Sequence, residues 1–290
     1  MREAAAGGRL PCLPVTDAAP PRVCYRHPDR ETRLACSSCA RPICVECSRD
    51  AAVGQKCPDC SAPEGRHKVV TAAQLRRTRS AAPVTYALIA IDVLVFFAGE
   101  LDPSLGRRML LEGAHLPALI SAGEWWRAFT AMFLHGGFTH VLFNMWALFI
   151  FGPAIEHRFG SVSFASLYLA SGLGGSALYQ AVGRDVFAVG ASGAIFGLMG
   201  ALLASAYRQR FTPAGRAVFS QLLLLLGINL ALPLIVPNIA WEAHLGGLAA
   251  GFAIAGAWDR LPIAGPGAVA RRVSVAIAIA VVAMAVVLIA

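Results

Sequence analysis

Long apolar runs without charges fill the C-terminal part of this chain, and they constrain its fold more than any other feature. Hydrophobic residues make up 57% of the sequence and charged residues only 14%, a composition far from that of a soluble domain. The runs lie between residues 84 and 290, whereas residues 1–80 are polar and rich in Arg and Cys. The chain is therefore expected to divide near Ser80 into a small soluble module and a polytopic membrane domain.

Seven segments are long and apolar enough to be compared with the ~20 residues that cross a bilayer. These predicted spans are 84–101, 138–155, 163–182, 192–207, 216–236, 241–258 and 273–290. The fourth is short, so one of its ends is expected to lie below the membrane surface, where water or loops can approach it.

Basic residues are unevenly shared between the two sides that these spans define. Twelve fall on the side of the N-terminus: Arg66, Lys68, Arg76, Arg77, Arg79, Arg158, Arg208, Arg210, Arg216, Arg260, Arg271 and Arg272. Four fall on the other side: Arg107, Arg108, Arg127 and Arg184. The positive-inside rule therefore predicts a multi-pass protein of the cell membrane with a cytoplasmic N-terminus and an extracytoplasmic C-terminus. The preference for Arg over Lys and the abundance of Ala indicate a GC-rich bacterial source.

Four polar side chains that could carry chemistry fall within these apolar segments. Ser192 lies in a Gly-Ala-Ser-Gly turn at 190–193, and the ionisable His244 lies in the sixth segment. His140 and Asn144 open the second segment four residues apart, so they share one helix face. In the predicted orientation all four lie in the outer half of the bilayer. This convergence favours one catalytic cavity over separate roles in helix packing and interhelical hydrogen bonding.

Several motifs in this region resemble those of the rhomboid intramembrane serine proteases, over about residues 80–260. The matching motifs are Glu124-Trp125-Trp126-Arg127, His135 with His140-Val141-Leu142-Phe143-Asn144, Gly190-Ala191-Ser192-Gly193, and Ala243-His244 followed by Gly247 and Gly251. The resemblance implies an all-α polytopic membrane protein with a six-helix core at 83–260. A loop and a seventh helix at 261–290 would follow that core.

The resemblance also implies a catalytic dyad. Ser192 would be the nucleophile and His244 the general base and later acid, because a serine hydroxyl is a weak nucleophile until an imidazole takes its proton. His140, Asn144 and the Ser192 backbone N–H would stabilise the oxyanion. Three further residues are expected to support the site: Gly190 and Gly193 beside the serine, and Phe196, whose ring would stack on His244. No cofactor is expected for catalysis.

Two other features of the apolar region have structural interpretations. Trp125 and Trp126 are expected to place the first outer loop in the membrane interface, with Arg127 anchoring that loop. Asp92 in the first span is costly at that depth and is expected to pair with a polar neighbour such as Asn229.

The N-terminal part contains all eight cysteines of the chain, mostly in pairs separated by two residues. The pairs are Cys24 and His27, Cys36 and Cys39, Cys44 and Cys47, and Cys57 and Cys60. This spacing predicts two tetrahedral structural zinc sites at 22–62, between a disordered tail (1–21) and a basic linker (63–82). The pattern resembles a B-box zinc finger, which implies that pairs one and three share one ion and pairs two and four the other. In that family the last pair is commonly histidine rather than Cys57 and Cys60.

Disulfides are a weaker alternative for these cysteines, because the positive-inside count places them in a reducing compartment. Cys12, which has no partner in the pattern, is expected to be a free thiol. The zinc module would present a surface to a cytoplasmic protein partner or regulate the protease. Nucleic-acid binding is disfavoured because no recognition helix or aromatic platform accompanies the arginines.

The sequence thus predicts a serine endopeptidase that cleaves transmembrane proteins near the outer face of the membrane, in contact with lipid. The alternative is a catalytically silent relative that binds membrane proteins, and the presence of both Ser192 and His244 disfavours it. A transporter would place polar residues along a path through both halves of the bilayer, whereas here they cluster on one side.

Overall fold

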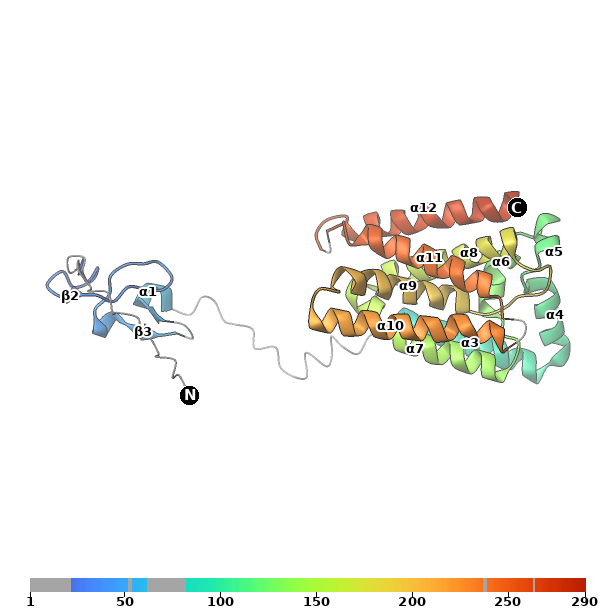
Figure 1. Cartoon of the computed structure of the whole chain (residues 1–290), viewed down its shortest axis with the longest axis horizontal. Helices are drawn as coiled ribbons and strands as arrows, with labels where there is room; N and C mark the ends of the chain where they lie inside the picture. The colour runs from blue at the N-terminus through green and yellow to red at the C-terminus, as the bar shows by residue number, and fades with distance from the viewer. Residues whose placement is uncertain (1–21, 52–53, 62–81, 237–238, 263) are drawn as a thin grey trace, which may run out of the picture. The chain divides into compact units, whose positions relative to one another are not determined.

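The computed structural model describes residues 22–51, 54–61, 82–236, 239–262 and 264–290. The chain separates into two compact units, Met1–Gln74 and Leu75–Ala290 (Figure 1). The predicted tail at 1–21, with Cys12, lies outside the described residues. The same holds for the predicted linker, apart from Ala82.

The N-terminal unit is built from very short elements around cysteine side chains. Its elements are β1 (Arg22–Val23), β2 (Glu31–Thr32), the 3-10 helix η1 (Val45–Cys47), β3 (Arg49–Asp50), β4 (Gln55–Lys56) and α1 (Pro58–Ser61). Strand β1 pairs antiparallel with β2, and β3 pairs antiparallel with β4. Among its described residues, Ile43 is the one member of the buried core that is not a cysteine. So small a core cannot offset the chain entropy lost on folding without further cross-links.

The regular elements in the described residues of the second unit are all helices. Its elements are α3 (Pro83–Leu101), α4 (Pro103–Gly113), α5 (Pro117–Ser121), α6 (Arg127–Thr130), η2 (Ala131–Phe133), α7 (Phe138–Phe159), α8 (Ser161–Val182), α9 (Ser192–Arg208), α10 (Pro213–Ala231), η3 (Leu232–Leu234), α11 (Trp241–Trp258) and α12 (Ala268–Ile289). Proline occupies the first turn of several helices, where its missing N–H costs nothing. Asp102 and Thr212 cap α4 and α10 through their side chains.

The predicted spans fall in α3, α7, α8, α9, α10, α11 and α12, with ends shifted by four or more residues in three of them. Helix α7 continues to Phe159 rather than ending at 155. Helix α12 begins at Ala268 rather than 273, directly after Gly267, whose positive φ of 72° ends the preceding turn. Helix α10 covers 213–231 rather than 216–236, because Thr212 and Pro213 start it earlier and a 3-10 turn follows it. The expected helical unit, preceded by a Cys-rich unit, is confirmed.

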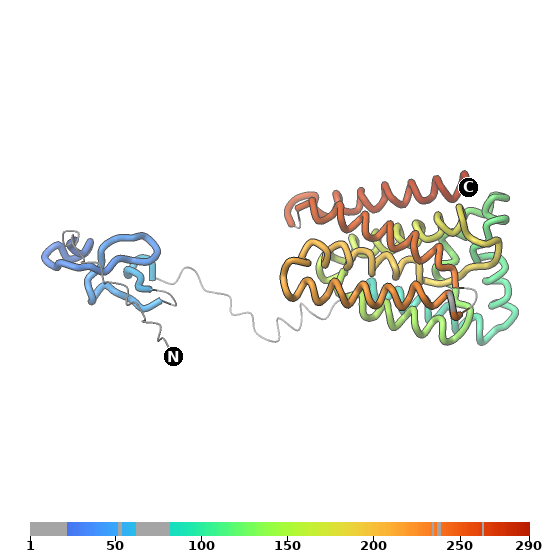
Figure 2. The backbone as a smooth tube through the Cα atoms, in the orientation of Figure 1, coloured from blue at the N-terminus to red at the C-terminus, as the bar shows by residue number. Residues whose placement is uncertain are grey.

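Within the described ranges, α3, α7, α10 and α12 are long and apolar enough to cross a membrane. Helix α9 has 17 residues and lies at the centre of its unit, in contact with α7, α8, α10 and α11 (Figure 2). Helices α8 and α11, which pack against α9 and each other, are rich in Gly and Ala. Helices α8, α9 and α11 are not among the described helices that meet these criteria of length and hydropathy, so the expected number of seven spans stays a prediction.

A buried carboxylate joins the start of α3 to the end of α7. Glu156 on α7 is 2% exposed and accepts hydrogen bonds from the Val84 N–H at 3.0 Å and the Thr85 N–H at 2.8 Å. It also accepts from the hydroxyls of Thr85 at 2.7 Å and Ser161 at 2.6 Å. These bonds satisfy the first free N–H groups of α3, so Glu156 acts as a cap supplied by another helix.

The expected pairing of Asp92 with Asn229 is wrong. Asp92 on α3 is fully buried, and its electrostatic neighbour is Tyr168 on α8, which is also fully buried. Asn229 instead donates to the backbone carbonyl of Leu225, one turn earlier in α10, at 2.8 Å. An amide on an apolar helix can satisfy itself on its own backbone, and so it needs no distant carboxylate.

Candidate active site and metal clusters

Ser192 is the first residue of α9 and follows a sharp backbone turn. Gly190 in that turn has a φ of 128°, and its N–H donates to the carbonyl of Ala131 at 2.9 Å. A Cβ at this position would lie 2.7 Å from His140 Nε2, so a larger residue would be both strained and crowded. The turn presents Ser192 at a helix N-terminus, where backbone N–H groups have no partners within the helix.

The hydroxyl of Ser192 lies in hydrogen-bond contact with His244 on α11. The distance from Ser192 Oγ to His244 Nε2 is 2.9 Å, across 52 positions of sequence. Helices α9 and α11 come close because glycines face backbone atoms: a Cβ on Gly247 or Gly251 would clash with the carbonyl of Gly193 or Gly197, respectively. Small residues on these two helices thus meet each other.

Phe196 lies one helical turn below Ser192 and stacks on the imidazole of His244. The ring centroids are 4.1 Å apart and the ring planes differ by 8°. A parallel contact of this kind fixes the plane of the imidazole, because any rotation would break the stack. Phe196, Ser192 and His244 therefore form one packed group.

His140 and Asn144 lie in the first two turns of α7, on its inward face. His140 Nε2 and Ser192 Oγ surround the same point, at 2.7 Å and 3.7 Å from the position that a Cβ on Gly190 would take. Asn144 is 7% exposed, and its Nδ2 donates to the carbonyl of His140 at 2.9 Å. One of the two amide hydrogens of Asn144 is used in that bond, which leaves the other for a ligand.

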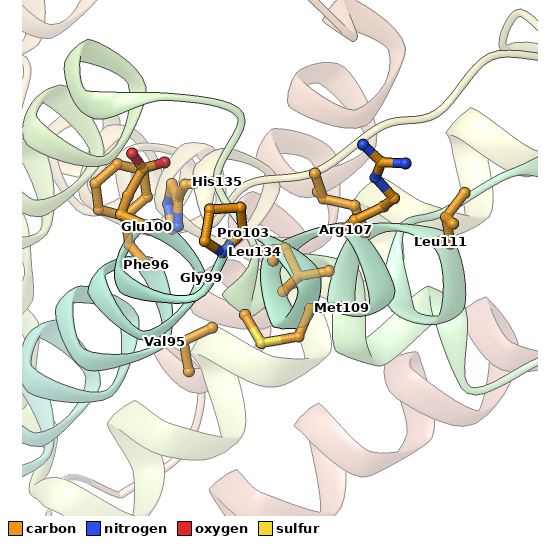
Figure 3. A pocket seen from close by; sticks show the side chains of 12 residues that line it. Val95, Phe96, Gly99, Glu100, Pro103, Arg107, Met109, Leu111, Leu134 and His135 are labelled. Atoms are coloured by element: carbon orange, nitrogen blue, oxygen red, sulfur yellow. The ribbon is translucent and has the colours of Figure 1, made fainter.

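A cavity of about 470 Å³ borders this site between α3 and α4 (Figure 3). His135 lines it together with apolar side chains such as Phe96, Met109 and Leu134. His135 is 7% exposed, and its ring packs edge-on against His140, with centroids 5.2 Å apart. The cavity thus touches the candidate active site through His135. This histidine is part of the sequence motif, but its spacing in the sequence suggested no role for it.

The segment between α3 and α7 is tied down by the residues of the Glu-Trp-Trp-Arg motif. Arg127 is 3% exposed; its Nε donates to Glu124 at 2.7 Å and its Nη1 to the carbonyl of Ala114 at 3.0 Å. The indole N–H of Trp126 donates to the carbonyl of Glu112 at 3.1 Å. Arg127 therefore holds α4 and α6 together.

The N-terminal unit gathers its paired ligands into two clusters. The first contains Cys24, His27, Cys44 and Cys47, and the second contains Cys36, Cys39, Cys57 and Cys60. In each cluster the potential ligand atoms lie within 4.8 Å of one another. The pairs combine one with three and two with four, as the resemblance implies.

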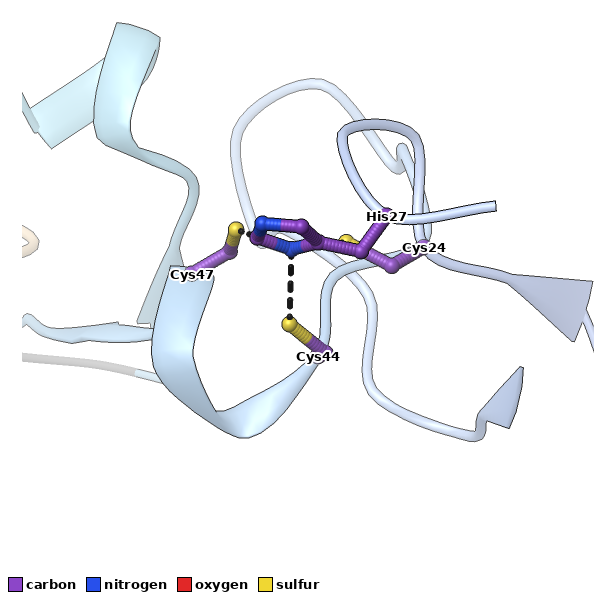
Figure 4. A group of neighbouring side chains, drawn as sticks. All are labelled: Cys24, His27, Cys44 and Cys47. Atoms are coloured by element: carbon purple, nitrogen blue, oxygen red, sulfur yellow. Dashed lines mark hydrogen bonds between the residues drawn. The ribbon is translucent and has the colours of Figure 1, made fainter. Parts of the chain in front are cut away.

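The first cluster is arranged around the imidazole of His27 (Figure 4). Its Nδ1 lies 3.3 Å from Cys44 Sγ, 3.4 Å from Cys47 Sγ and 3.9 Å from Cys24 Sγ. A tetrahedral zinc with one nitrogen and three sulfur ligands would hold nitrogen and sulfur about 3.5 Å apart, so the geometry fits that ion with Nδ1 as the ligand atom.

The second cluster has four sulfurs, and Arg41 lies against it. Cys39 Sγ and Cys57 Sγ are 3.8 Å apart, close to the separation of about 3.8 Å that a tetrahedral zinc with sulfur ligands requires. Hydrogen bonding from the Arg41 side chain is the largest influence on Cys39 and lowers the pKa of its thiol. Sequence spacing identified the sulfurs but gave no role to Arg41, because an arginine beside a cysteine is not itself a signal.

Comparison with known proteins places the helical unit in a family. A family model for the rhomboid domain matches residues 122–258. Rhomboid protease GluP of Bacillus subtilis (strain 168) is 40% identical over 185 residues, which cover 62% of this chain and 36% of GluP. RHOMBOID-like protein 1 of Arabidopsis thaliana is 43% identical over 130 residues, covering 44% of this chain and 33% of that protein.

A shorter relative is matched over most of its length. YdcA of Bacillus subtilis (strain 168) is 40% identical over 135 residues, which cover 46% of this chain and 67% of YdcA. The chain therefore belongs to the rhomboid family and is a multi-pass membrane protein. It spans only about a third of the length of GluP and of RHOMBOID-like protein 1.

Proposed function

We propose that the protein is an intramembrane serine endopeptidase that cleaves transmembrane protein substrates. The observation that carries this proposal is the 2.9 Å contact between Ser192 Oγ and His244 Nε2, made between two helices of a membrane domain. A serine outside an active site has no need of an imidazole aimed at its hydroxyl. Relatives named as rhomboid proteases support the same reaction class.

In this mechanism His244 takes the proton of Ser192 as the hydroxyl oxygen attacks the carbonyl carbon of the substrate. The negative charge that develops on the carbonyl oxygen is met by the Ser192 N–H, His140 and the free amide hydrogen of Asn144. His244 then gives its proton to the leaving amine. Water, activated by the same imidazole, hydrolyses the acyl-enzyme and restores Ser192.

Substrates would reach this site near the outer face of the membrane. Ser192 begins α9 and His140 lies in the first turn of α7. The positive-inside count supports an extracytoplasmic position for both helix starts. A transmembrane helix that unwinds at its outer end would expose a peptide bond at that depth. The N-terminus would then be cytoplasmic and the C-terminus extracytoplasmic.

Labelling by a serine-directed phosphonate tests the dyad directly. The wild-type protein in detergent should be labelled and should cleave a generic transmembrane substrate, because His244 activates the Ser192 oxygen. Both signals should disappear in Ser192→Ala and in His244→Ala. Ser205→Ala is a matched control, since Ser205 lies on the same helix as Ser192 but near its opposite end, and its side chain is 7% exposed.

Labelling that persists in Ser192→Ala would show that another residue is the nucleophile. A wild-type protein that is folded but neither labelled nor active would favour the catalytically silent alternative. In that case the protein would bind membrane proteins without cleaving them.

We further propose that the N-terminal clusters hold two structural zinc ions. Each cluster has four ligand atoms, which complete a tetrahedral zinc shell and leave no position for a reacting water. The ions would supply the cross-links that a core of one isoleucine and several cysteines lacks. This unit would occupy residues 22–62 and offer a surface to a cytoplasmic protein partner.

Metal analysis of the purified chain checks this stoichiometry. Two zinc ions per chain are expected by elemental analysis, falling to about one in a Cys24→Ser, Cys44→Ser double variant, because each cluster binds one ion. A content below two in the wild type under zinc-replete conditions would overturn the two-site proposal.

A further inference from the structure

The two metal clusters differ in charge. With a divalent ion, three thiolates and a neutral imidazole leave the first cluster with one negative charge, whereas four thiolates leave the second with two. Cys36 and Cys57 in the second cluster are buried, so this excess charge is partly shielded from water. A nearby cation or N–H donor would stabilise it.

Arg41 supplies such donors at the second cluster. Its Nε lies 3.3 Å from Cys39 Sγ, and its Nη2 lies 3.9 Å from Cys57 Sγ. The two nitrogens of one planar guanidinium thus reach sulfurs from two different ligand pairs. A fork of this shape can approach both sulfurs at once, which a lysine ammonium on a flexible stem does less well.

The guanidinium of Arg41 is held in place from two further directions. Its Nη2 pairs with Asp59 Oδ2 at 3.1 Å, and its Cζ lies 4.5 Å from the ring centroid of Tyr25. The hydroxyl of Tyr25 donates to the same Asp59 carboxylate at 3.1 Å. Because Tyr25 follows a ligand of the first cluster and Asp59 precedes a ligand of the second, Arg41 is fixed by residues that metal binding itself orders.

Arg30 occupies a comparable place at the first cluster but is engaged differently. It lies beside Cys44, and its Nη1 pairs with Glu46 at 2.7 Å. Arg41, in contrast, contacts two sulfurs of the second cluster, those of Cys39 and Cys57.

We propose that Arg41 is an outer-sphere partner of the metal in the second cluster, where its N–H groups donate to the sulfurs of Cys39 and Cys57 and strengthen metal binding. The inference rests on the zinc binding proposed above. Donation to a thiolate disperses its charge and orients its lone pairs toward the ion. Outer-shell groups of this kind typically change metal affinity by about 10- to 100-fold.

Arg41→Gln in the full chain should therefore weaken one metal site by about 10- to 100-fold and leave the other unchanged. Zinc affinities are measured by competition with a chromophoric chelator. Cobalt(II) substitution identifies the weakened site, since the absorption bands of cobalt differ between four sulfur ligands and three sulfurs with one nitrogen. The spectrum of the cluster with His27 should persist in the variant after that of the four-sulfur cluster is lost.

Two further variants complete the test. Arg33→Gln removes an exposed arginine of the same unit and should leave both affinities at the wild-type value. Arg41→Lys keeps the charge without the fork and should resemble Arg41→Gln more than the wild type. Equal affinities in wild type and Arg41→Gln would overturn the proposal, as would a parallel loss at both clusters. A wild-type chain that binds no zinc would instead overturn the metal sites themselves.

Discussion

The imidazole of His244 is positioned by an aromatic ring rather than by a carboxylate. Its Nε2 faces Ser192, while its Nδ1 has no hydrogen-bond partner among the described residues. Phe196 fixes the plane of the ring but does not select which nitrogen carries the proton. In the proposed mechanism the hydroxyl of Ser192 donates to Nε2, and this contact favours the tautomer that the mechanism requires.

The two side chains at the start of α7 should act mainly in the transition state. His140→Ala and Asn144→Ala are each expected to lower turnover by about 10- to 1000-fold with little change in substrate affinity, because oxyanion donors meet charge that the ground state lacks. Steady-state kinetics in detergent would measure both quantities, with thermal unfolding recorded in parallel. A fall in stability that matches the fall in turnover would indicate a structural pair instead.

Single residues also mark the limit of what sequence can predict. Ser192, His244 and Phe196 were identified because motif and helical spacing place them together, and the structure brings them together. The partner of Asp92 was predicted wrongly, because Asn229 can bond to the Leu225 carbonyl of its own helix and spacing does not reveal that choice. Arg41 contacts Cys57 and Asp59, and Glu156 contacts Thr85, and these contacts with distant segments are not encoded by any local pattern.

Among the helices, the contact between α9 and α11 matters most to the candidate site. Gly247 and Gly251 on α11 face backbone carbonyls of Gly193 and Gly197 on α9. Farther along α11, Gly256 has nothing within 4 Å of the position that a Cβ would take. One helix thus carries both crowded and open glycines. Replacing each kind by alanine distinguishes the effect of close helix packing from the effect of helix propensity.

Alanine at the crowded glycines should disable the site by moving the helices apart. Gly247→Ala or Gly251→Ala is expected to lower activity by about 100-fold, since a displacement of about 1 Å at reacting groups can cost that much. Each should also destabilise the protein by about 1–3 kcal/mol through overpacking.

Gly256→Ala is the matched control on the same helix. It should leave activity unchanged and raise stability by about 0.5–1 kcal/mol, because alanine restricts the unfolded chain and fits a helix interior. Thermal unfolding and substrate cleavage would be measured for all three variants. Activity in Gly247→Ala equal to that in Gly256→Ala would show that close packing of α9 and α11 is not needed.

The helices themselves were more predictable than their ends. Apolar runs located seven long helices, because burial in lipid or protein selects such runs regardless of detail. The ends of α10 and α12 depended instead on Thr212, Pro213 and Gly267, local signals that hydropathy does not weigh. Helices α4 to α6, which lie between α3 and α7, went unpredicted, since that segment is mostly polar or mixed in character.

At the scale of the whole molecule, two compact units rely on different stabilising forces. The helical unit has an extended buried core and internal hydrogen bonds such as those of Glu156. The N-terminal unit has clustered thiols and one buried isoleucine. Loss of metal should therefore unfold one unit and leave the other intact.

Chelation offers a test of this independence. Removing zinc from the purified chain in detergent should abolish the far-ultraviolet circular-dichroism signal of the N-terminal unit and the absorption bands seen when cobalt replaces zinc. Cleavage of a transmembrane substrate should continue. The physical reason is that every predicted zinc ligand lies between residues 24 and 60, far in sequence from Ser192 and His244. Loss of cleavage in a sample whose helical unit is still folded would show that the two units are functionally coupled.

The alternation of ligand pairs along the chain has a consequence for biosynthesis. Cys24, His27, Cys36 and Cys39 emerge from the ribosome before Cys44, and these four donors can capture one ion in a non-native set. The native arrangement then requires ligand exchange once Cys44 and Cys47 are available, and again when Cys57 and Cys60 follow. With zinc bound as proposed, maturation of this unit would be under kinetic control, and its rate would depend on how quickly zinc dissociates from the early, misligated set of ligands.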